Sequence, residues 1–190
     1  MNYIYNYLIP SIWISYLIYW WTKSADVKES IRTESSLSRL TRSVSIILAA
    51  ILLLPVKFGI PILNLRFLPL SEWCFWAGTA VTGSGLLFSV WGRYHLGKNW
   101  SQAVTIKDDH KLITNGPYGL VRHPIYTGFL MGFLGSSIAL GEWRGLVAVA
   151  LVFIVLLHKL RLEDKWLQEQ FGKSYELYSK RVCALVPFLI

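Results

Sequence analysis

Long apolar runs are the feature that most limits how this 190-residue chain can fold. Five of them stand out: about Tyr3 to Trp21, Ser43 to Leu65, Leu70 to Trp91, a run that starts at Pro124, and a shorter one from about Gly145 to Leu157. A helix of about 20 apolar residues is long enough to cross a hydrocarbon core of about 30 Å. Only 16% of the residues are charged, against roughly 25% in a soluble domain. The sequence therefore predicts an all-α integral membrane protein with about five transmembrane helices.

Prolines and glycines shape the predicted spans. Pro55 and Pro61 fall inside the second run, where we expect them to kink the helix because proline removes a backbone hydrogen bond. Small residues let helices approach closely; they are Gly78, Gly83, Ser84 and Gly85 in the third run and the Gly128-x-x-x-Gly132 pattern in the fourth. The last pattern fits either packing within the chain or a dimer.

The tail after His158 changes character. Its apolar residues recur at near-helical spacing with charges between them; they are Leu160, Leu167, Phe171 and Tyr178. This pattern is typical of an amphipathic helix. We expect that helix to lie at the membrane surface.

Basic residues indicate which side of the membrane each loop occupies. Residues 22–42 and 93–122 carry five Lys or Arg each, and the tail after His158 carries six, of 19 in the chain. With five spans these segments share one side, which the positive-inside rule makes cytoplasmic, with the N-terminus outside. Topology thus accounts for the net charge of +8, and we expect no nucleic-acid partner. Cys74 and Cys183 form no paired motif, so we expect no metal site.

Polar residues gather where the fourth and fifth spans meet their cytoplasmic segments. A helical hairpin brings together the end of residues 93–122, the start of the fourth span and the start of the tail. His123 and Tyr126 are three residues apart, and Lys159 and Glu163 are four apart. Each pair therefore shares one helix face.

Such a junction suits a cofactor with a carboxylate, an amine and a cationic centre. The free N–H groups of a helix start attract a carboxylate, which His123 would also contact. Glu163 could hold an amine or a ribose hydroxyl, and the faces of Tyr118 and Tyr126 could stabilise a sulfonium. Simpler readings stay open: Arg122 as a topological anchor, His123 as a helix cap, and Tyr126 as an interfacial aromatic. The tail bases could likewise contact lipid headgroups.

Residues from about 95 to 187 resemble the C-terminal half of the isoprenylcysteine carboxyl methyltransferases. The matching segments are, in order, K-L-I-T-N-G-P-Y-G-L-V-R-H-P-I-Y-T-G, then L-E-D, then F-G-K-S-Y-E-L-Y-S-K-R-V and a closing Pro187. The family pattern is R-H-P-x-Y-x-G, an acidic pair, and F-G-x-x-Y-x-x-Y-x-x-R-V. Both the order and the spacing agree.

The resemblance implies an S-adenosylmethionine-dependent methyltransferase inside the membrane, without a Rossmann domain. Carried over by position, the cofactor-binding residues are Gln102, His110, Lys111, Leu112, Ile113, Tyr118, His123, Pro124, Ile125, Tyr126 and Glu163. Lys159 matches a basic residue that faces the substrate carboxylate, and Arg161 is a second candidate for that role. No residue is assigned a catalytic role and no metal is implied.

The chain departs from the family pattern in two places. The acidic pair is Glu163-Asp164 rather than Glu-Glu, and Lys159 stands where the eukaryotic enzymes have Arg. A lysine cannot form the two-pronged contact that arginine makes with a carboxylate. We expect residues 1–92 to form three N-terminal spans, and residues 93–190 to form the catalytic region within the same structural unit.

The expected reaction is methyl transfer to a carboxylate of a lipophilic, prenylcysteine-like acceptor that enters from the bilayer, at the cytoplasmic face. Three alternatives stay open. A membrane sterol or lipid reductase would use a nicotinamide cofactor. A phospholipid N-methyltransferase would need a base, for which His123 could serve. A non-catalytic scaffold would only hold anionic lipid with its basic loops.

Overall fold

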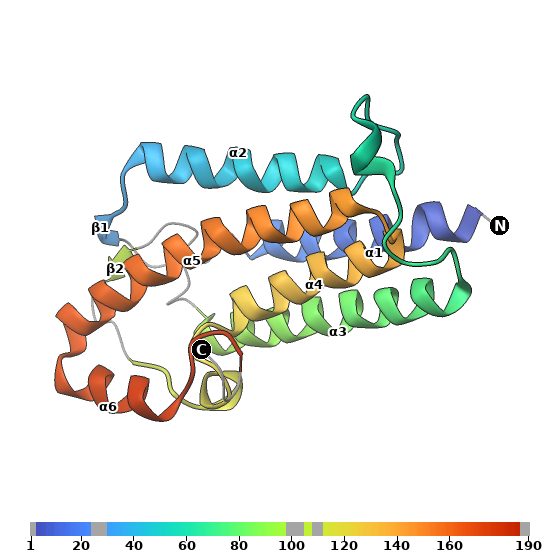
Figure 1. Ribbon diagram of the computed structural model, residues 1–190. Coiled ribbons are helices and arrows are strands. Elements are labelled where there is room, and N and C mark those ends of the chain that lie inside the picture. The colour runs from blue at the N-terminus through green and yellow to red at the C-terminus, as the bar shows by residue number, and fades with distance from the viewer. Residues whose placement is uncertain (1–2, 24–29, 98–104, 108–111, 187–190) are drawn as a thin grey trace.

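The structure, a computed structural model, describes residues 3–23, 30–97, 105–107 and 112–186 (Figure 1). Three predicted site residues, Gln102, His110 and Lys111, lie outside the described residues, as does Pro187 of the family pattern. Five helices of 17 residues or more form the described part of the molecule: α1 (Tyr3–Thr22), α2 (Ser36–Leu52), α3 (Glu72–Leu96), α4 (Pro124–Leu140) and α5 (Trp143–Phe171). They lie lengthwise beside one another, and a short helix α6 (Lys173–Arg181) follows α5.

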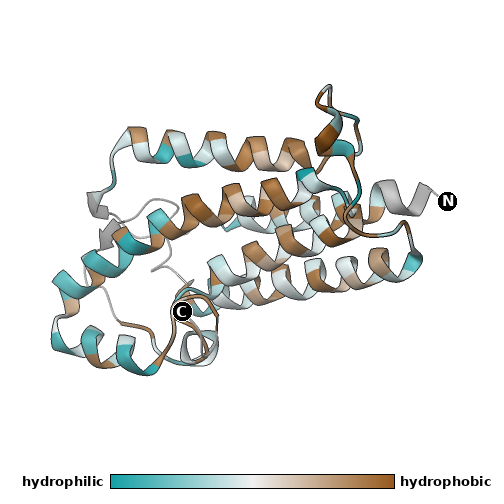
Figure 2. Cartoon of the chain, viewed as in Figure 1, coloured by the Kyte–Doolittle hydropathy of each residue, from teal (hydrophilic) through white to brown (hydrophobic). Residues whose placement is uncertain are grey.

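Two of the described helices, α3 and α5, are long and apolar enough to cross a membrane, and α4 is a shorter apolar helix. Only 33% of the most apolar stretch of α5 is buried inside the molecule. Much of this apolar stretch therefore faces outward, and residues in the middle of the bundle are predominantly apolar (Figure 2). A water-soluble core helix would bury most of such a stretch. That five helices span a membrane stays a prediction.

The fifth predicted span and the predicted tail helix are largely one helix. α5 continues for 29 residues to Phe171, well beyond the predicted end at Leu157. Gly172, with φ of 51°, ends it, because this left-handed conformation suits glycine. The last turns of α5 and most of α6 are hydrophilic, with apolar residues between the polar ones (Figure 2). Their position at a membrane surface stays a prediction.

The second predicted span is wrong in its extent. α2 begins at Ser36, where the Ser35 side chain accepts a hydrogen bond from the Ser38 amide, and it ends at Leu52 rather than Leu65. Pro55 follows the helix end instead of kinking its middle, since the residue before a proline is pushed out of the helical region. The other proline of this run opens a short 3-10 helix, η1 (Pro61–Asn64).

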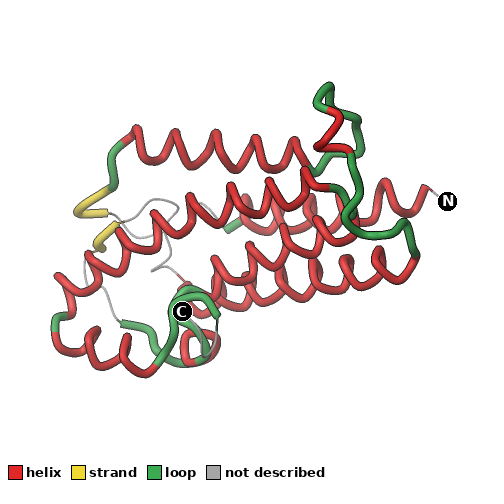
Figure 3. Tube along the Cα trace, viewed as in Figure 1, coloured by secondary structure: helices red, strands yellow, loops and turns green. Residues whose placement is uncertain are grey.

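Two short antiparallel strands pair two polar segments in which the sequence analysis predicted no strand. β1 (Ser30–Thr33) precedes α2, and β2 (Thr105–Lys107) lies between α3 and α4. Figure 3 shows the two strands beyond the start of α2, close to α5. This ribbon is an addition to the predicted all-α architecture, and it ties the segment before α2 to the loop that precedes α4.

Glycines let α3 and α4 touch backbone to backbone. A Cβ atom on Gly78 would lie 2.5 Å from the carbonyl oxygen of Gly135, and one on Gly85 would lie 2.8 Å from that of Gly128. Both distances are far below ordinary van der Waals contact, so only glycine fits. The predicted role of small residues is confirmed at these positions but wrong at Gly83, whose surroundings are open. The glycine pattern of α4 therefore serves packing within the chain.

α1 packs on the pair of α3 and α4, and α2 packs on α5. From α1, Nε1 of Trp13 donates to Ser136 Oγ at 3.0 Å, and the Tyr16 and Ser89 hydroxyls lie 2.9 Å apart. Nη1 of Arg144 at the start of α5 donates to the carbonyl of Leu52 at 3.0 Å. α2 and α5 are therefore antiparallel, and the start of α2 lies beside the later turns of α5 (Figure 1).

Candidate active site

The segment before α4 is held by the chain's returning tail. The backbone N–H of Arg122 donates to Cys183 at 2.8 Å, and that of His123 donates to Ala184 at 3.0 Å. The hydroxyl of Thr127 also donates to the carbonyl of Leu185 at 2.6 Å. These bonds fix the segment between the bundle and α6. As predicted, Pro124 is the first residue of α4, where the missing proline N–H costs nothing.

Asp164 on α5 is the first of two carboxylates around which the site is organised. It accepts hydrogen bonds from Nη2 of Arg122 at 3.0 Å and from Nε2 of His123 at 2.7 Å. The hydroxyl of Tyr175 on α6 donates to the same carboxylate. Burial and the charge of Asp164 raise the pKa of Tyr175, so this phenol stays protonated. Arg122 also donates to the carbonyls of Ser179 and Val182, which makes it a link between α5, α6 and the start of α4.

Glu163, the neighbouring carboxylate, is contacted by residues that the sequence analysis selected for the site. The Tyr126 hydroxyl donates to its Oε1 at 2.5 Å, and Nζ of Lys159 lies 3.8 Å from that same oxygen. Lys159 is only 8% exposed, and its ammonium also lies 5.1 Å from the centre of the Tyr126 ring. Such a position allows a cation–π contact. A buried cation, a phenol and a carboxylate thus meet one helical turn into α4.

His123 stands between the two carboxylates. Its Nε2 faces Asp164, its Nδ1 lies 3.5 Å from Oε2 of Glu163, and its ring stacks on that of Tyr126 with an angle of 4° between the planes. Burial disfavours the charged imidazole, but the hydrogen bonds and charges of Asp164 and Glu163 outweigh it. The pKa of His123 is therefore raised above its ordinary value, which favours the cationic ring between the two carboxylates.

Tyr118 closes the site from the loop before α4. It lies in the short helix η3 (Gly116–Gly119), is 7% exposed, and its hydroxyl donates to the carbonyl of Gly92 on α3 at 3.4 Å. Its own carbonyl accepts from the hydroxyl of Tyr178 at 2.7 Å. Burial raises the pKa of Tyr178 to about 12. Both phenols are therefore neutral donors that fasten η3 to α3 and α6.

The structure brings together most of the described residues that the sequence selected. His123, Tyr126, Lys159 and Glu163 form one cluster, and Tyr118 is buried beside the start of α4 in η3. Pro124 and Ile125 pack against Gly92 of α3. Leu112 and Ile113 are half-buried in the segment before η3, and their role in the site stays a prediction. Arg161 is exposed, two residues from Lys159 and outside the contacts described above.

Sequence reasoning missed one part of the site and one ion pair close to it. Asp164 and Tyr175 are central to the site, although neither was selected as a site residue. Their positions within the acidic pair and the F-G-x-x-Y pattern were the available signals. Glu34 and Arg42 form an ion pair at the start of α2, outside the cofactor cluster. They fall in a segment that the sequence analysis treated as a basic cytoplasmic loop, which gave no reason to select them.

The fold and the cluster define a class: a bundle of apolar helices with a polar, mostly buried site at one end, built from a helix start, its preceding loop and a returning tail. The family model for phospholipid methyltransferases matches residues 73–174, just over half of the chain. The chain belongs to this family. The match covers α3, α4, η3 and α5, and therefore most of the site.

Relatives and a solved structure give the same picture. The chain is 36% identical over 96 residues to a probable protein-S-isoprenylcysteine O-methyltransferase of Oryza sativa subsp. indica, covering 49% of this chain and 50% of the relative. It is 32% identical over 119 residues to the cobalt-zinc-cadmium resistance protein CzcN of Cupriavidus metallidurans, covering 60% and 54%.

A structure of the eukaryotic intramembrane Ras methyltransferase ICMT (isoprenylcysteine carboxyl methyltransferase) matches with a TM-score of 0.60 at 22% identity, over 84% of this chain and 55% of that one. The predicted resemblance is thus confirmed. The likeness, with the outward-facing apolar helices, indicates an integral membrane protein. The chain spans about half the length of the curated relatives it matches.

Proposed function

We propose that this protein is an S-adenosylmethionine-dependent methyltransferase that modifies the carboxylate of a lipophilic, prenylcysteine-like acceptor. The observation that carries the proposal is the cluster in which Lys159, Tyr126 and His123 surround Glu163 at the start of α4. It combines a buried cation for an acceptor carboxylate with a carboxylate for the hydroxyls or amine of the cofactor. These groups fall inside the segment that matches the family.

The residues present fit such a cofactor. The first turn of α4 has no acidic residue, and the side chain of its cap, His123, makes no capping hydrogen bond among the described residues. No acidic side chain in that turn therefore competes with the cofactor carboxylate for the positive end of the helix dipole. Glu163 is 21% exposed at its side chain, so it can still accept from a ribose hydroxyl or an amine. When bound, S-adenosylmethionine supplies a methyl group on an electrophilic sulfonium.

One buried donor supports the same fit. Nε of Arg122 has no hydrogen-bond partner among the residues that the structure describes. A buried donor without an acceptor is costly, so a ligand that accepts from it would stabilise the site. We assign cofactor binding to Tyr118, His123, Pro124, Ile125, Tyr126 and Glu163 on these grounds, and to Gln102, His110, Lys111, Leu112 and Ile113 from the sequence pattern alone.

The chain's own residues would act mainly by positioning. A carboxylate acceptor is already ionised near neutral pH, so the reaction needs no general base. Lys159, rather than the exposed Arg161, is placed to hold that carboxylate, since its ammonium is buried beside Tyr126. Orientation and removal of water from the nucleophile then supply the rate gain.

The arrangement of the helices supports a cytoplasmic site. The end of α1, the start of α2, the end of α3, the start of α4 and the end of α5 lie at one end of the bundle (Figure 1). These ends border the three basic segments of the sequence. The positive-inside rule places this end in the cytoplasm and the N-terminus outside. In this arrangement residues 93–190 form the catalytic region, residues 1–92 supply three spans, and the acceptor enters from the bilayer among surrounding lipids.

Methylation of a phospholipid amine is the second candidate, because the matching family model is described as phospholipid methyltransferase. That reaction requires a base to take a proton from the amine. His123 is poorly suited to this task because two carboxylates raise its pKa and engage both ring nitrogens. The site therefore favours an acceptor that is already deprotonated.

A labelled methyl group tests the proposal. Purified protein is incubated with methyl-labelled S-adenosylmethionine and a farnesylated N-acetylcysteine, and the product is then treated with base. A carboxyl ester releases volatile labelled methanol, which is the expected result. No transfer, together with binding of a nicotinamide cofactor instead of S-adenosylmethionine, would mean that the chain is a reductase.

A further inference from the structure

A buried ion pair at the start of α2 lies outside the cofactor site described above. Glu34, only 5% exposed, accepts from Nη1 and Nη2 of Arg42 at 2.8 and 2.5 Å. The hydroxyl of Ser38 donates to the same carboxylate at 2.8 Å. Because both terminal nitrogens of Arg42 engage Glu34, the guanidinium plane is fixed and not free to swing into solvent.

Because α2 packs antiparallel on α5, the position of this ion pair along the bundle can be compared with that of Lys159. Arg144 contacts Leu52 at one end of the two helices. From there Arg42 lies ten residues back along α2, about 15 Å, and Lys159 lies fifteen residues along α5, about 22 Å, at 1.5 Å per residue. Helical side chains lean toward the helix N-terminus, so Arg42 extends toward the level of Lys159.

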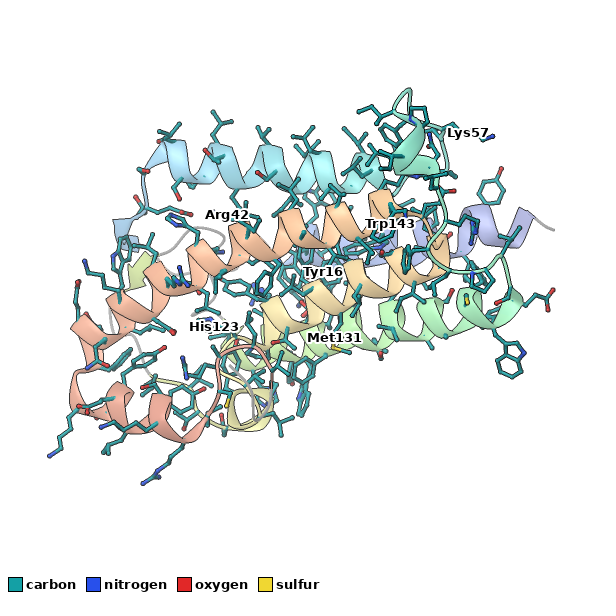
Figure 4. The ribbon with its side chains drawn as sticks, in the orientation of Figure 1. Tyr16, Arg42, Lys57, His123, Met131 and Trp143 are labelled. Atoms are coloured by element: carbon teal, nitrogen blue, oxygen red, sulfur yellow. The ribbon has the colours of Figure 1, made fainter. Side chains whose placement is uncertain are left out.

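The electrostatics agree with this placement. Arg42 is close enough to Tyr126, Glu163 and Lys159 for their charges to interact. Its side chain is 11% exposed, and in Figure 4 Arg42 lies on the side of α2 that faces α5. Two buried cations, one from each helix, therefore approach the same carboxylate-rich place.

A structural role alone explains this pair poorly. Burying two charges costs several kcal/mol in lost hydration, and an apolar pair of similar size is often as stable or more so. Arginine has five N–H donors, of which the two bonds to Glu34 use two. The remaining donors form the flat edge that fits a carboxylate, which Lys159 lacks.

We propose that Arg42, held in place by Glu34, is a second acceptor-binding residue and that the acceptor carboxylate lies between Arg42 and Lys159. The assignment rests on the proposed function and extends it to a helix outside the family match. It also accounts for a lysine at position 159: the two-pronged contact comes from α2 instead of α5. Glu34 is then a positioning residue that acts through Arg42.

Direct binding of two ligands tests the assignment. The probes are farnesylated N-acetylcysteine and its carboxamide, which lacks the negative charge. The key variant is the double change Glu34→Gln with Arg42→Gln, which removes both charges and leaves no unpaired buried carboxylate. Arg42→Lys keeps the charge without the fork. Arg39→Gln is the matched control, because Arg39 is an exposed arginine on the same helix.

We expect wild-type protein and Arg39→Gln to prefer the carboxylate over the carboxamide. The preference should fall about tenfold or more in the double variant and in Arg42→Lys, as losses at buried charge pairs usually do. The S-adenosylmethionine affinity should be unchanged in all four proteins, which also shows that each variant is folded. The same preference in wild type and the double variant would overturn the assignment.

The readout separates this inference from the proposed function. If wild type transfers no methyl group, the function is wrong, yet the carboxylate preference still reports on Arg42. If wild type transfers methyl with the same acceptor KM in the double variant, the function stands and the role of Arg42 does not.

Discussion

Nε2 of His123 lies 2.7 Å from Oδ1 of Asp164 while the same imidazole faces Glu163 through Nδ1. One ring thus joins the two neighbouring carboxylates of α5 to the first residue before α4. Asp164 directs its remaining contacts outward, to Arg122 and Tyr175, and holds the tail. Glu163 directs its contacts inward, to Tyr126 and Lys159. The acidic pair therefore divides into a structural carboxylate and a ligand-facing one.

This division predicts that Asp164→Asn mainly reduces stability. The change leaves Arg122 without its anion and His123 with Glu163 alone, and removal of one partner from a buried ion pair costs about 3–5 kcal/mol. The melting temperature in detergent should fall. The control is Glu176→Gln, which removes an exposed pair with Lys180 and should not measurably change it. An Asp164→Asn protein as stable as wild type would mean that the tail does not depend on this carboxylate.

Glu163→Ala should act on the cofactor instead. It removes the acceptor that Tyr126 and His123 surround, so the Kd for S-adenosylmethionine should rise about tenfold or more, a loss of at least about 1.4 kcal/mol. Titration calorimetry on the purified protein measures it. An unchanged Kd would mean that Glu163 of α5 does not contact the cofactor.

Lys159→Ala should raise the acceptor KM and leave the cofactor Kd nearly unchanged. The buried ammonium is the α5 cation nearest to Tyr126 and Glu163. The matched change Arg161→Ala removes an exposed cation two residues away and should alter neither constant. If Arg161→Ala raised the acceptor KM and Lys159→Ala did not, Arg161 would be the residue that contacts the substrate.

Stability should depend on the titration of His123. Its folded-state pKa is raised above the ordinary value of about 6.5 by Asp164 and Glu163 against the opposing effect of burial. The cationic ring therefore adds stability that is complete below about pH 6.5 and is lost as the pH rises through the raised pKa. Melting temperatures measured from mildly acidic to alkaline pH should fall in wild type and less so in His123→Gln. Identical pH profiles would contradict this role.

The seam between α3 and α4 should not tolerate a methyl group. Gly85→Ala places a Cβ 2.8 Å from the Gly128 carbonyl oxygen, and such overpacking costs about 1–3 kcal/mol. Gly83→Ala, two residues before it on the same helix, meets open space and should be neutral or slightly stabilising. Equal melting temperatures for the two variants would exclude backbone contact between these helices.

The sequence correctly predicted the features that depend on residues close together in the chain. Pro124 starts α4, and helical spacing put Tyr126 beside His123 and Lys159 beside Glu163. Those features follow from fixed backbone geometry and from residues three or four apart. The hairpin argument also correctly brought α4 and α5 together at their polar ends.

The features that sequence reasoning missed depend on contacts between distant segments. The end of α2 at Leu52, the ribbon of β1 and β2, and the pair of Glu34 with Arg42 all involve partners with no periodic signal. The role of Asp164 became visible only when α6 brought Tyr175 back against it. Packing between distant segments decides such contacts, and composition or spacing in one segment does not reveal them.

The choice of acceptor is the central claim, and competition between two acceptors tests it most directly. Purified protein in vesicles receives methyl-labelled S-adenosylmethionine with equal amounts of farnesylated N-acetylcysteine and phosphatidylethanolamine, and the label is divided into base-labile and base-stable fractions. We predict that most of the label is released by base as methanol and that Lys159→Ala sharply reduces this fraction. Label found mainly in base-stable phospholipid would contradict the account and identify an N-methyltransferase.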